Sequence, residues 1–357
     1  MSLVGVCEKI TLHTFHPEGL KDDVLVNFEP FGIEVDVHPT RNRFVFDYLY
    51  PLAAPRIMPL PRQKGPPVRV TGEYVLRFGC LEGDFRVSAK RAVYDPQSGN
   101  TPSAFGENGS TAERLALVLN SDEIRRLAQT DDIGIAAARL MSRDNTAAIV
   151  VKDGAAGAHV FDGKAAPRHV PAFPTRSVYK IGSGDVFSAT FAHAWLSGER
   201  SADYAANLAS RRVADYVETP AFPLAPTSFA RLPAPSTAGR RKVLLSMPGN
   251  GTTKGWLREQ AVRGLAGLGA AVSIAGAPVP GAVASDDAHG DCDVVLALLS
   301  LSDVAGAKAE LRAAVARGKP VVAFTDDPAV LDEVRGAGVT ATDDLCSALY
   351  LTQWIPT

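Results

Sequence analysis

The stretch YKIGSGDVFSATFAHAW, residues 179–195, holds the pattern that decides the fold of the first half of the chain. Gly182 and Gly184 lack a Cβ, so the backbone can turn sharply there and a ligand can approach closely. From Asp185 onward apolar residues recur at three- and four-residue steps, which predicts a helix with a buried face. The free N–H groups at the start of such a helix favour an anion, and Asp185 stands beside them as a carboxylate. Phosphoryl transfer to a hydroxyl needs an anion site beside a base, which is one interpretation of this stretch. The competing interpretation is that Asp185 only caps the helix and the glycines only form a turn.

Bulk composition limits the class of protein. A chain of 357 residues suggests about two domains, and 46% hydrophobic with 21% charged residues is typical of a globular protein. The net charge of −2 and the lack of a dense basic run argue against nucleic acid or an anionic membrane as a partner. No apolar run approaches the roughly 18 residues of a transmembrane helix. The four cysteines are far apart, which indicates neither a disulfide framework nor a zinc site and favours the cytoplasm.

A proline-rich segment, PAFPLAPTSFARLPAPSTAGR at 220–240, predicts a linker between a first domain over 1–219 and a second over 241–357. After it, apolar strands alternate with helices from KVLLSM to PVVAF, which predicts a parallel, doubly wound sheet. Before it, TAERLALVLNSDEIRRLAQ predicts a strand and a helix. TAAIVVKDGAAGAHVFDG predicts a strand, a glycine turn and another strand.

Several motifs of the first domain, about residues 1–220, resemble a ribokinase-like (PfkB-type) carbohydrate kinase that is shortened at its N-terminal side. IGSGDVFSATF is similar to the second half of that family's signature, Asp-Thr-x-Gly-Ala-Gly-Asp opening a long helix. Asn120 and Glu123 match its Asn-x-x-Glu, and VYDPQS is similar to its strand ending in Asp-Pro-Asn. VVKDGAAGAHVF resembles its glycine-containing nucleotide turn, and DYAANLASRRVA resembles the helix after the signature.

The resemblance implies a role for each matching residue. Asp185 would be the base that accepts the hydroxyl proton, and an anion hole would be formed by the N–H groups of Gly182, Ser183 and Gly184. Asn120 and Glu123 would organise Mg²⁺, or they could be only a helix cap with a first-turn acid. ATP would be bound by Lys152, Gly154, Gly157 and Asn207. Lys152 could instead be a solvated charge at a strand end, and Asn207 a polar residue in mid-helix.

This sequence also departs from the family pattern. Tyr179 and Lys180 stand where the family has Asp-Thr. The early Gly-Gly signature is absent, and the motifs begin near residue 70, so much of the sugar-binding region and its lid is expected to be missing. The N-terminal segment holds polar candidates at Asp36, His38 and Asp47, but their spacing assigns them no role.

The second domain resembles the nucleoside 2-deoxyribosyltransferase-like family over residues 241–345. VLLSMPGNGTTKGW is similar to its opening strand, Gly306, Ala307 and Glu310 take its Gly-Thr-x-x-Glu positions, and Gly-Lys-Pro follows at 318–320. The resemblance implies that Glu310 attacks an anomeric carbon, as the nucleophile of a retaining glycosidase does. The competing interpretations are an exposed first-turn helix acid and a plain helix terminus.

We therefore expect an α/β protein, with a truncated ribokinase-like domain followed by a smaller flavodoxin-like domain. The leading function is phosphorylation of a hydroxyl on a sugar or nucleoside, with ATP and Mg²⁺ as cofactors. One alternative is a nucleoside N-glycosidase or deoxyribosyltransferase in the C-terminal domain. Another is a non-catalytic nucleotide-binding protein built from degenerate enzyme folds. A small-molecule partner is expected, and a homo-oligomer is left open.

Overall fold

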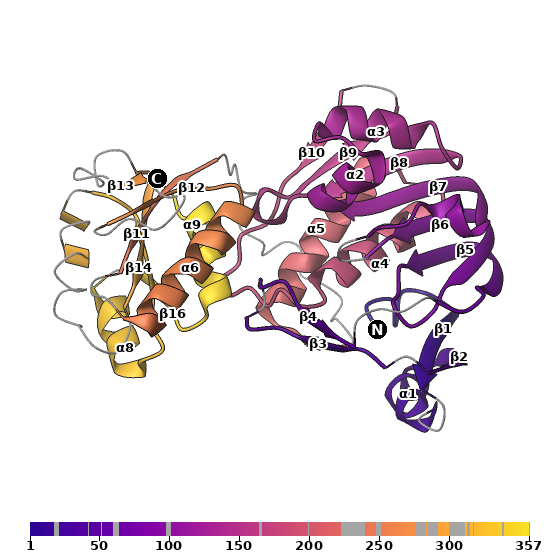
Figure 1. Ribbon diagram of the computed structural model, residues 1–357, viewed down its shortest axis with the longest axis horizontal. Helices are drawn as coiled ribbons and strands as arrows, with labels where there is room; N and C mark the ends of the chain where they lie inside the picture. Colours follow the sequence, from indigo (N-terminus) through magenta and orange to yellow (C-terminus); the bar gives the residue numbers. More distant parts are fainter. Residues whose placement is uncertain are drawn as a thin grey trace.

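A computed structural model gives the architecture of the chain (Figure 1). It describes residues 1–17, 21–41, 43–50, 52–59, 64–97, 101–163, 166–198, 200–222, 240–247, 251–275, 283–284, 292–299, 311–312, 315–316, 318–337 and 339–356. No helix within these ranges is long and apolar enough to cross a membrane.

The first large sheet has the strand order β10-β9-β8-β7-β6-β5. Neighbours among β5 to β8 run parallel, whereas β9 and β10 add antiparallel strands at one edge. The bounds are β5 (Val68–Phe78), β6 (Phe85–Asp95), β7 (Thr111–Asn120), β8 (Thr146–Lys152), β9 (Ala158–Phe161) and β10 (Arg168–Val170). The strand–helix and strand–turn–strand predictions for 111–129 and 146–163 are confirmed, with η3 (Gly154–Ala156) in the turn.

Helices cover both faces of this sheet. The side chains of β7 and β8 alternate between the faces: Val118 and Val150 pack against Phe191, while Leu119 and Ile149 pack on the other side. One face is covered by α4 (Ser183–Leu196) and α5 (Ala202–Glu218), the other by α2 (Ser121–Ala128) and α3 (Ile133–Met141), with η2 (Phe105–Asn108) beside them. Both cores are formed almost wholly by aliphatic and aromatic side chains, as in a three-layer α/β domain.

The second large sheet has the order β13-β12-β11-β14-β15-β16, and every neighbouring pair is parallel. Its elements are β11 (Lys242–Ser246), α6 (Thr252–Gly267), β12 (Ala271–Ile274), β13 (Val283–Ala284), β14 (Val294–Leu298), β15 (Val321–Phe324), α8 (Pro328–Gly336), β16 (Thr340–Thr342) and α9 (Leu345–Trp354). The predicted parallel sheet is confirmed. Without the two-residue β13 the order is flavodoxin-like; with it the order is that of a Rossmann sheet, so the finer assignment stays a prediction.

Two small sheets precede the first large one. β1 (Ile10–Pro17) and β2 (Ile33–Thr40) run parallel and are connected through α1 (Lys21–Phe28) and η1 (Glu29–Phe31). β3 (Val45–Asp47) and β4 (Arg56–Met58) form a short antiparallel pair. Figure 1 shows β1, α1 and β2 at the end of the molecule away from the second domain.

The last helix of the second domain lies against the first domain. Cys346 and Tyr350 of α9 share a buried cluster with Val178 and Tyr216. Ser347 accepts a hydrogen bond from the Val178 amide at 2.8 Å. The two domains are therefore joined by a buried, hydrogen-bonded contact between residues far apart in sequence.

Candidate active site

The glycine turn before α4 adopts the backbone conformation that its sequence favours. Gly182 has φ of 80°, in the left-handed region, and a Cβ there would lie 2.7 Å from the Tyr216 hydroxyl oxygen. The Tyr216 hydroxyl donates to the Ile181 carbonyl at 2.8 Å, which holds the turn against α5. The N–H of Ser183 donates to the Lys180 carbonyl at 3.1 Å. Among the described residues no backbone acceptor pairs with the N–H of Gly184, so that amide is available to an anion.

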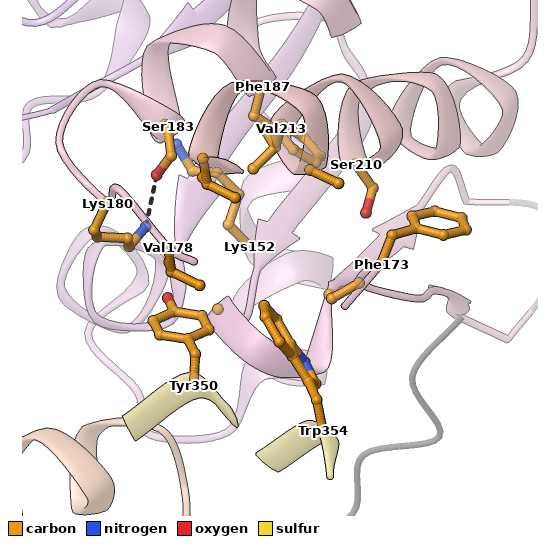
Figure 2. Close-up of a pocket in the computed structure, with 16 residues that line it drawn as sticks. Lys152, Phe173, Val178, Lys180, Ser183, Phe187, Ser210, Val213, Tyr350 and Trp354 are labelled. Atoms are coloured by element: carbon orange, nitrogen blue, oxygen red, sulfur yellow. Dashed lines mark hydrogen bonds between the residues drawn. The ribbon is translucent and has the colours of Figure 1, made fainter. Parts of the chain in front are cut away.

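Lys180 adds a cation to this helix terminus. Its Nζ donates to Ser183 Oγ at 3.0 Å (Figure 2), and no carboxylate forms an ion pair with it within the described ranges. Burial, followed by the nearby charge of Lys152, lowers the pKa of the Lys180 ammonium group. An anion placed between the two ammonium groups would relieve this repulsion. Lys180 therefore places a second ammonium group, besides that of Lys152, in the lining of the same pocket.

A buried ion pair holds Lys152 at the end of β8. Its Nζ donates to Asp95 Oδ2 at 2.7 Å, and the same oxygen accepts from Ser188 Oγ at 2.6 Å. Burial acts to lower the pKa of Lys152, but the carboxylates of Asp95 and Glu123 outweigh it and raise the pKa. Asp95 is fully buried, and its Oδ1 has no hydrogen-bond partner among the described residues. Lys152 is therefore a fixed, charged group at the pocket rather than a solvated strand end.

Asp185 lies in the first turn of α4, and Gln97 holds its side chain. Gln97 follows β6 with φ of 40°, and its amide nitrogen donates to Asp185 Oδ1. Asp185 is exposed to solvent, yet the protein around it displaces part of its water and raises the pKa of its carboxyl group. The Gln97 hydrogen bond opposes this shift. A carboxylate with a raised pKa is better suited to accept a proton than an ordinary aspartate.

Asn120 and Glu123 form a capping box at the start of α2. Asn120 Oδ1 accepts from the amides of Asp122 and Glu123 at 3.0 and 2.9 Å, and Glu123 Oε2 accepts from the Asn120 amide at 2.8 Å. The cap interpretation is thus confirmed, and it accounts for the Asn120 side-chain oxygen. Burial raises the pKa of Glu123, while Lys152 opposes the shift.

A role for Glu123 at a metal is compatible with this cap. Mg²⁺ usually binds to one or two carboxylates together with waters and substrate phosphates. Glu123 Oε2 is engaged by the Asn120 amide, and no hydrogen bond involves Oε1 in the described part of the chain. Glu123 therefore fits an ion that arrives with a phosphate, whereas Asn120 fits poorly because its oxygen already accepts two hydrogen bonds.

Lys152, Lys180, Ser183 and Gly184 line one pocket, drawn in Figure 2. Asp95, Gln97, Asn120, Glu123 and Asp185 are not among its lining residues. One part is polar, with Lys152, Lys180 and the start of α4. The other part is apolar and is lined by Phe173, Val178, Val213, Ala214, Val217, Tyr350 and Trp354. A pocket with cations at one end and apolar walls at the other suits a ligand that carries phosphates and a ring system.

Two aromatic residues of the second domain complete the apolar wall. Tyr350 and Trp354 extend from α9 into the pocket, as Figure 2 shows. The Trp354 indole N–H donates to the Ala155 carbonyl at 3.0 Å, within the glycine turn over η3. No motif in the sequence indicated these residues, because they reach the site only through the contact between domains.

The predicted residues are distributed unevenly around this pocket. Its lining includes Lys152, Gly154, Gly157, Ser183 and Gly184. The predicted residues of the first domain that do not line it are Gly182, Asp185, Asn120, Glu123 and Asn207. Asn207 Oδ1 accepts from Arg211 Nε at 2.9 Å along α5. Asp95 and Gln97 belong to the quoted VYDPQS motif but were assigned no role from the sequence.

The predicted site of the second domain is not described by the structure. Gly306, Ala307 and Glu310 lie outside the described residues. Parallel sheets bind ligands where the strand order reverses, here between the carboxyl ends of β11 and β14. The chain after both ends, 248–250 and 300–310, also lies outside the described residues. The roles of Glu310 and of Gly-Lys-Pro at a glycosyl site stay predictions.

A comparison with protein families matches residues 115–216 to the pfkB family carbohydrate kinase. The match runs from β7 to α5 and includes the capping box, the glycine turn of η3 and the start of α4. It covers less than a third of the chain. This segment is similar to pfkB carbohydrate kinases, which supports a ribokinase-like kinase in the first domain. None of the curated proteins matches the chain.

The solved structures that match this chain include ribokinase-family proteins. A pyrophosphate-dependent kinase of that family, complexed with a pyrophosphate analog and myo-inositol, has 17% identity and a TM-score of 0.41, covering 60% of this chain and 82% of that one. A ribokinase from Thermotoga maritima has 14% identity and a TM-score of 0.39, covering 63% and 77%. A putative ribokinase II from E. coli, in complex with ATP and Mg²⁺, has 13% identity and a TM-score of 0.42, covering 61% and 79%. At these values the likeness identifies no substrate for this chain.

Proposed function

We propose that the first domain transfers a phosphoryl group from ATP to a hydroxyl of a sugar or nucleoside. The observation that supports this most directly is the placement of Lys180, which lines the pocket at the start of α4 without a carboxylate ion-pair partner among the described residues. Lys152, held by Asp95, supplies a second cation to the same pocket. Phosphoryl transfer depends mainly on positioning and on neutralising phosphate charge, which two fixed cations and a helix N-terminus provide.

Each residue would then have a defined task. Lys152, Lys180 and the Gly184 amide hold the phosphates, while the apolar wall with Tyr350 and Trp354 receives the base of the nucleotide. Asp185 accepts the proton of the attacking hydroxyl, and the Gln97 hydrogen bond orients its carboxylate. Glu123 would hold Mg²⁺, which neutralises phosphate charge when bound.

The test is a coupled binding and turnover measurement on the purified full chain. ATP, ADP and pyrophosphate are each titrated by calorimetry, and a panel of sugars and nucleosides is then incubated with ATP and Mg²⁺. The expected result is ATP binding and a phosphorylated product with at least one acceptor. If none of the three ligands binds, the proposal is overturned. Binding without product on any acceptor would favour the non-catalytic nucleotide-binding alternative.

A further inference from the structure

The N-terminal unit places three potential metal ligands on one face of its small sheet. In the register of β1 and β2, His13 lies beside Asp36 and Phe15 lies beside His38. Side chains two residues apart on a strand share a face, and paired residues of neighbouring strands do so too. His13, Asp36 and His38 therefore project to the same side, although 22 residues of chain, including α1, separate His13 from Asp36.

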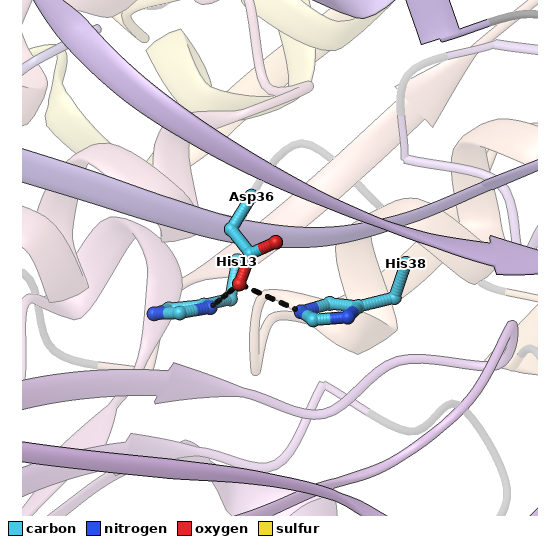
Figure 3. Close-up of side chains that lie close together, drawn as sticks. All are labelled: His13, Asp36 and His38. Atoms are coloured by element: carbon cyan, nitrogen blue, oxygen red, sulfur yellow. Dashed lines mark hydrogen bonds and ion pairs between the residues drawn. The ribbon is translucent and has the colours of Figure 1, made fainter.

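The three side chains converge on one point. His13 Nδ1 lies 3.0 Å from Asp36 Oδ2, and His38 Nε2 lies 3.4 Å from the same oxygen. Figure 3 shows the two imidazole rings facing one another across that oxygen. One potential ligand atom from each residue lies within 4.8 Å of the other two. His38 Nε2 is buried and makes no hydrogen bond with any described residue.

We propose that His13, Asp36 and His38 form a binding site for a divalent transition-metal ion of the Zn²⁺ class. Two imidazoles and a carboxylate are ligands that Zn²⁺ accepts, and bonds of about 2.0–2.1 Å in a tetrahedron place neighbouring ligand atoms about 3.3 Å apart. Two of the three separations, 3.0 and 3.4 Å, are close to this value, and the third is within 4.8 Å, so a modest movement of the side chains would complete the geometry. Three protein ligands leave one position for water or another small ligand.

Aromatic rings form the surroundings of this site. Phe85, the first residue of β6, meets the rings of His13 and His38 edge-on, with centroids 6.4 and 5.7 Å apart. Phe15 packs against Phe85 at 4.5 Å. Apolar groups around a metal site limit access of water and fix the ligand rings. They also connect the site to the first large sheet.

The position of the site suggests a structural purpose for the ion. β1 and β2 form a sheet of only two strands, and such sheets are marginally stable on their own. A metal bound by His13 on β1 and by Asp36 and His38 on β2 would cross-link both strands. The ion would thus fasten the N-terminal unit, a role independent of the proposed phosphoryl transfer.

Cobalt binding by the untagged full chain tests the proposal. The protein is stripped with a chelator, dialysed and titrated with Co²⁺, whose visible absorption reports nitrogen and oxygen ligation in a four- or five-coordinate site. We expect one Co²⁺ per chain, its displacement by Zn²⁺, and a rise in melting temperature on metal addition. His38→Gln and, separately, Asp36→Asn should each weaken binding by more than about tenfold, since even partners outside the ligand shell contribute that much.

A second histidine pair provides the matched control. His159 and His169 have ring centroids 5.2 Å apart but no carboxylate in a cluster with them among the described residues. The double variant His159→Gln/His169→Gln should retain the absorption and stoichiometry. Circular dichroism of each metal-free variant separates loss of a ligand from loss of the fold, and Asp36→Asn, nearly isosteric at a half-exposed side chain, is the milder change. No bound Co²⁺, or binding that survives both ligand substitutions, would overturn the site and leave a plain histidine–carboxylate hydrogen-bond cluster.

Discussion

The indole N–H of Trp354, in the last helix of the second domain, donates to the carbonyl of Ala155 in the glycine turn of the first domain at 3.0 Å. Tyr350, one helical turn earlier, packs beside Trp354 with ring centroids 5.2 Å apart. Both side chains line the pocket that contains Lys152 and Lys180. The second domain therefore supplies part of the wall of the proposed nucleotide site.

Removing the indole should weaken nucleotide binding more than it slows chemistry. Trp354→Ala removes a ring surface available to the base, and loss of such stacking reduces affinity by about tenfold. The dissociation constant of ATP, measured by calorimetry, should rise while that of pyrophosphate stays unchanged. Trp354→Phe keeps an aromatic ring but lacks the N–H, so its dissociation constant for ATP should lie between those of the original protein and Trp354→Ala. If ATP binds Trp354→Ala more tightly than the original protein, α9 obstructs the base instead of contacting it.

Lys180 should contribute to binding of the phosphates. Lys180→Met keeps much of the apolar stem and removes the charge, so the Kd of ATP and that of pyrophosphate should both rise by about tenfold or more, as expected when a hydrogen bond from a charged group is lost. The matched control is Lys90→Met, because Lys90 pairs with Glu73 at the surface at 3.1 Å. If ATP and pyrophosphate bind Lys180→Met as tightly as they bind Lys90→Met, Lys180 is excluded from the phosphate site.

Asp185→Asn should separate the proposed base from the binding groups. The substitution preserves shape but removes the proton acceptor, so kcat should fall by about two or more orders of magnitude, with little change in ATP affinity. Asp122→Asn is the control, since Asp122 is an exposed acid in the first turn of α2. Product formation is followed with whichever acceptor the screen identifies. An unchanged kcat would eliminate Asp185 as the base.

Local patterns in the sequence predicted the parts of this structure that local interactions determine. The strand and helix that meet at Asn120 follow from an apolar run and a capping box. The turn at Gly182 follows from glycine's access to positive φ. The capping contacts at Asn120 lie within three residues of one another, and the φ of Gly182 is a property of glycine itself, so both patterns could be read without the fold.

The remaining contacts of the site depend on tertiary structure. Asp95 ends β6 and Lys152 ends β8, and these two strands flank β7 in the same parallel sheet. Both residues therefore lie at the same edge of the sheet, where their side chains meet. Trp354 reaches Ala155 only through the contact between domains. His13 and Asp36 are paired by strand register, which the N-terminal sequence did not predict. The residues of each pair are far apart in sequence and belong to no common motif, so the sequence alone does not indicate that they meet.

Gly182→Ala should test how strictly the turn requires glycine. A left-handed φ costs a residue with a Cβ about 1–2 kcal/mol, and the close approach to the Tyr216 hydroxyl adds to this. We expect the free energy of unfolding, measured with urea, to decrease by at least that amount. Gly255→Ala is the control: Gly255 is exposed in α6 with no atom near its missing Cβ, so alanine should increase stability by about 0.5–1 kcal/mol. A neutral Gly182→Ala would show that the turn tolerates a side chain.

The raised pKa of Asp185 also predicts how stability depends on pH. Because the surrounding protein displaces part of the water around this carboxyl group, its pKa is raised in the folded protein. The folded state therefore retains the proton at pH values where the unfolded chain, with a carboxyl pKa of about 3.9, has already lost it. The folded state therefore loses stability as pH rises from the pKa of Asp185 in the unfolded chain to its higher pKa in the folded protein. The loss persists at all pH values above this window.

Asp185→Asn has no proton to lose at this position. Its melting temperature relative to that of the original protein should increase as pH rises through the window and then stay constant to neutral pH. Glu123, whose pKa is also raised, is present in both proteins, so the difference between their melting temperatures reports mainly on Asp185. Differential scanning calorimetry from acidic to neutral pH makes the measurement. A difference that does not vary with pH would mean that the Asp185 carboxyl group titrates alike in the folded and unfolded chains, and a base with a raised pKa would then be excluded.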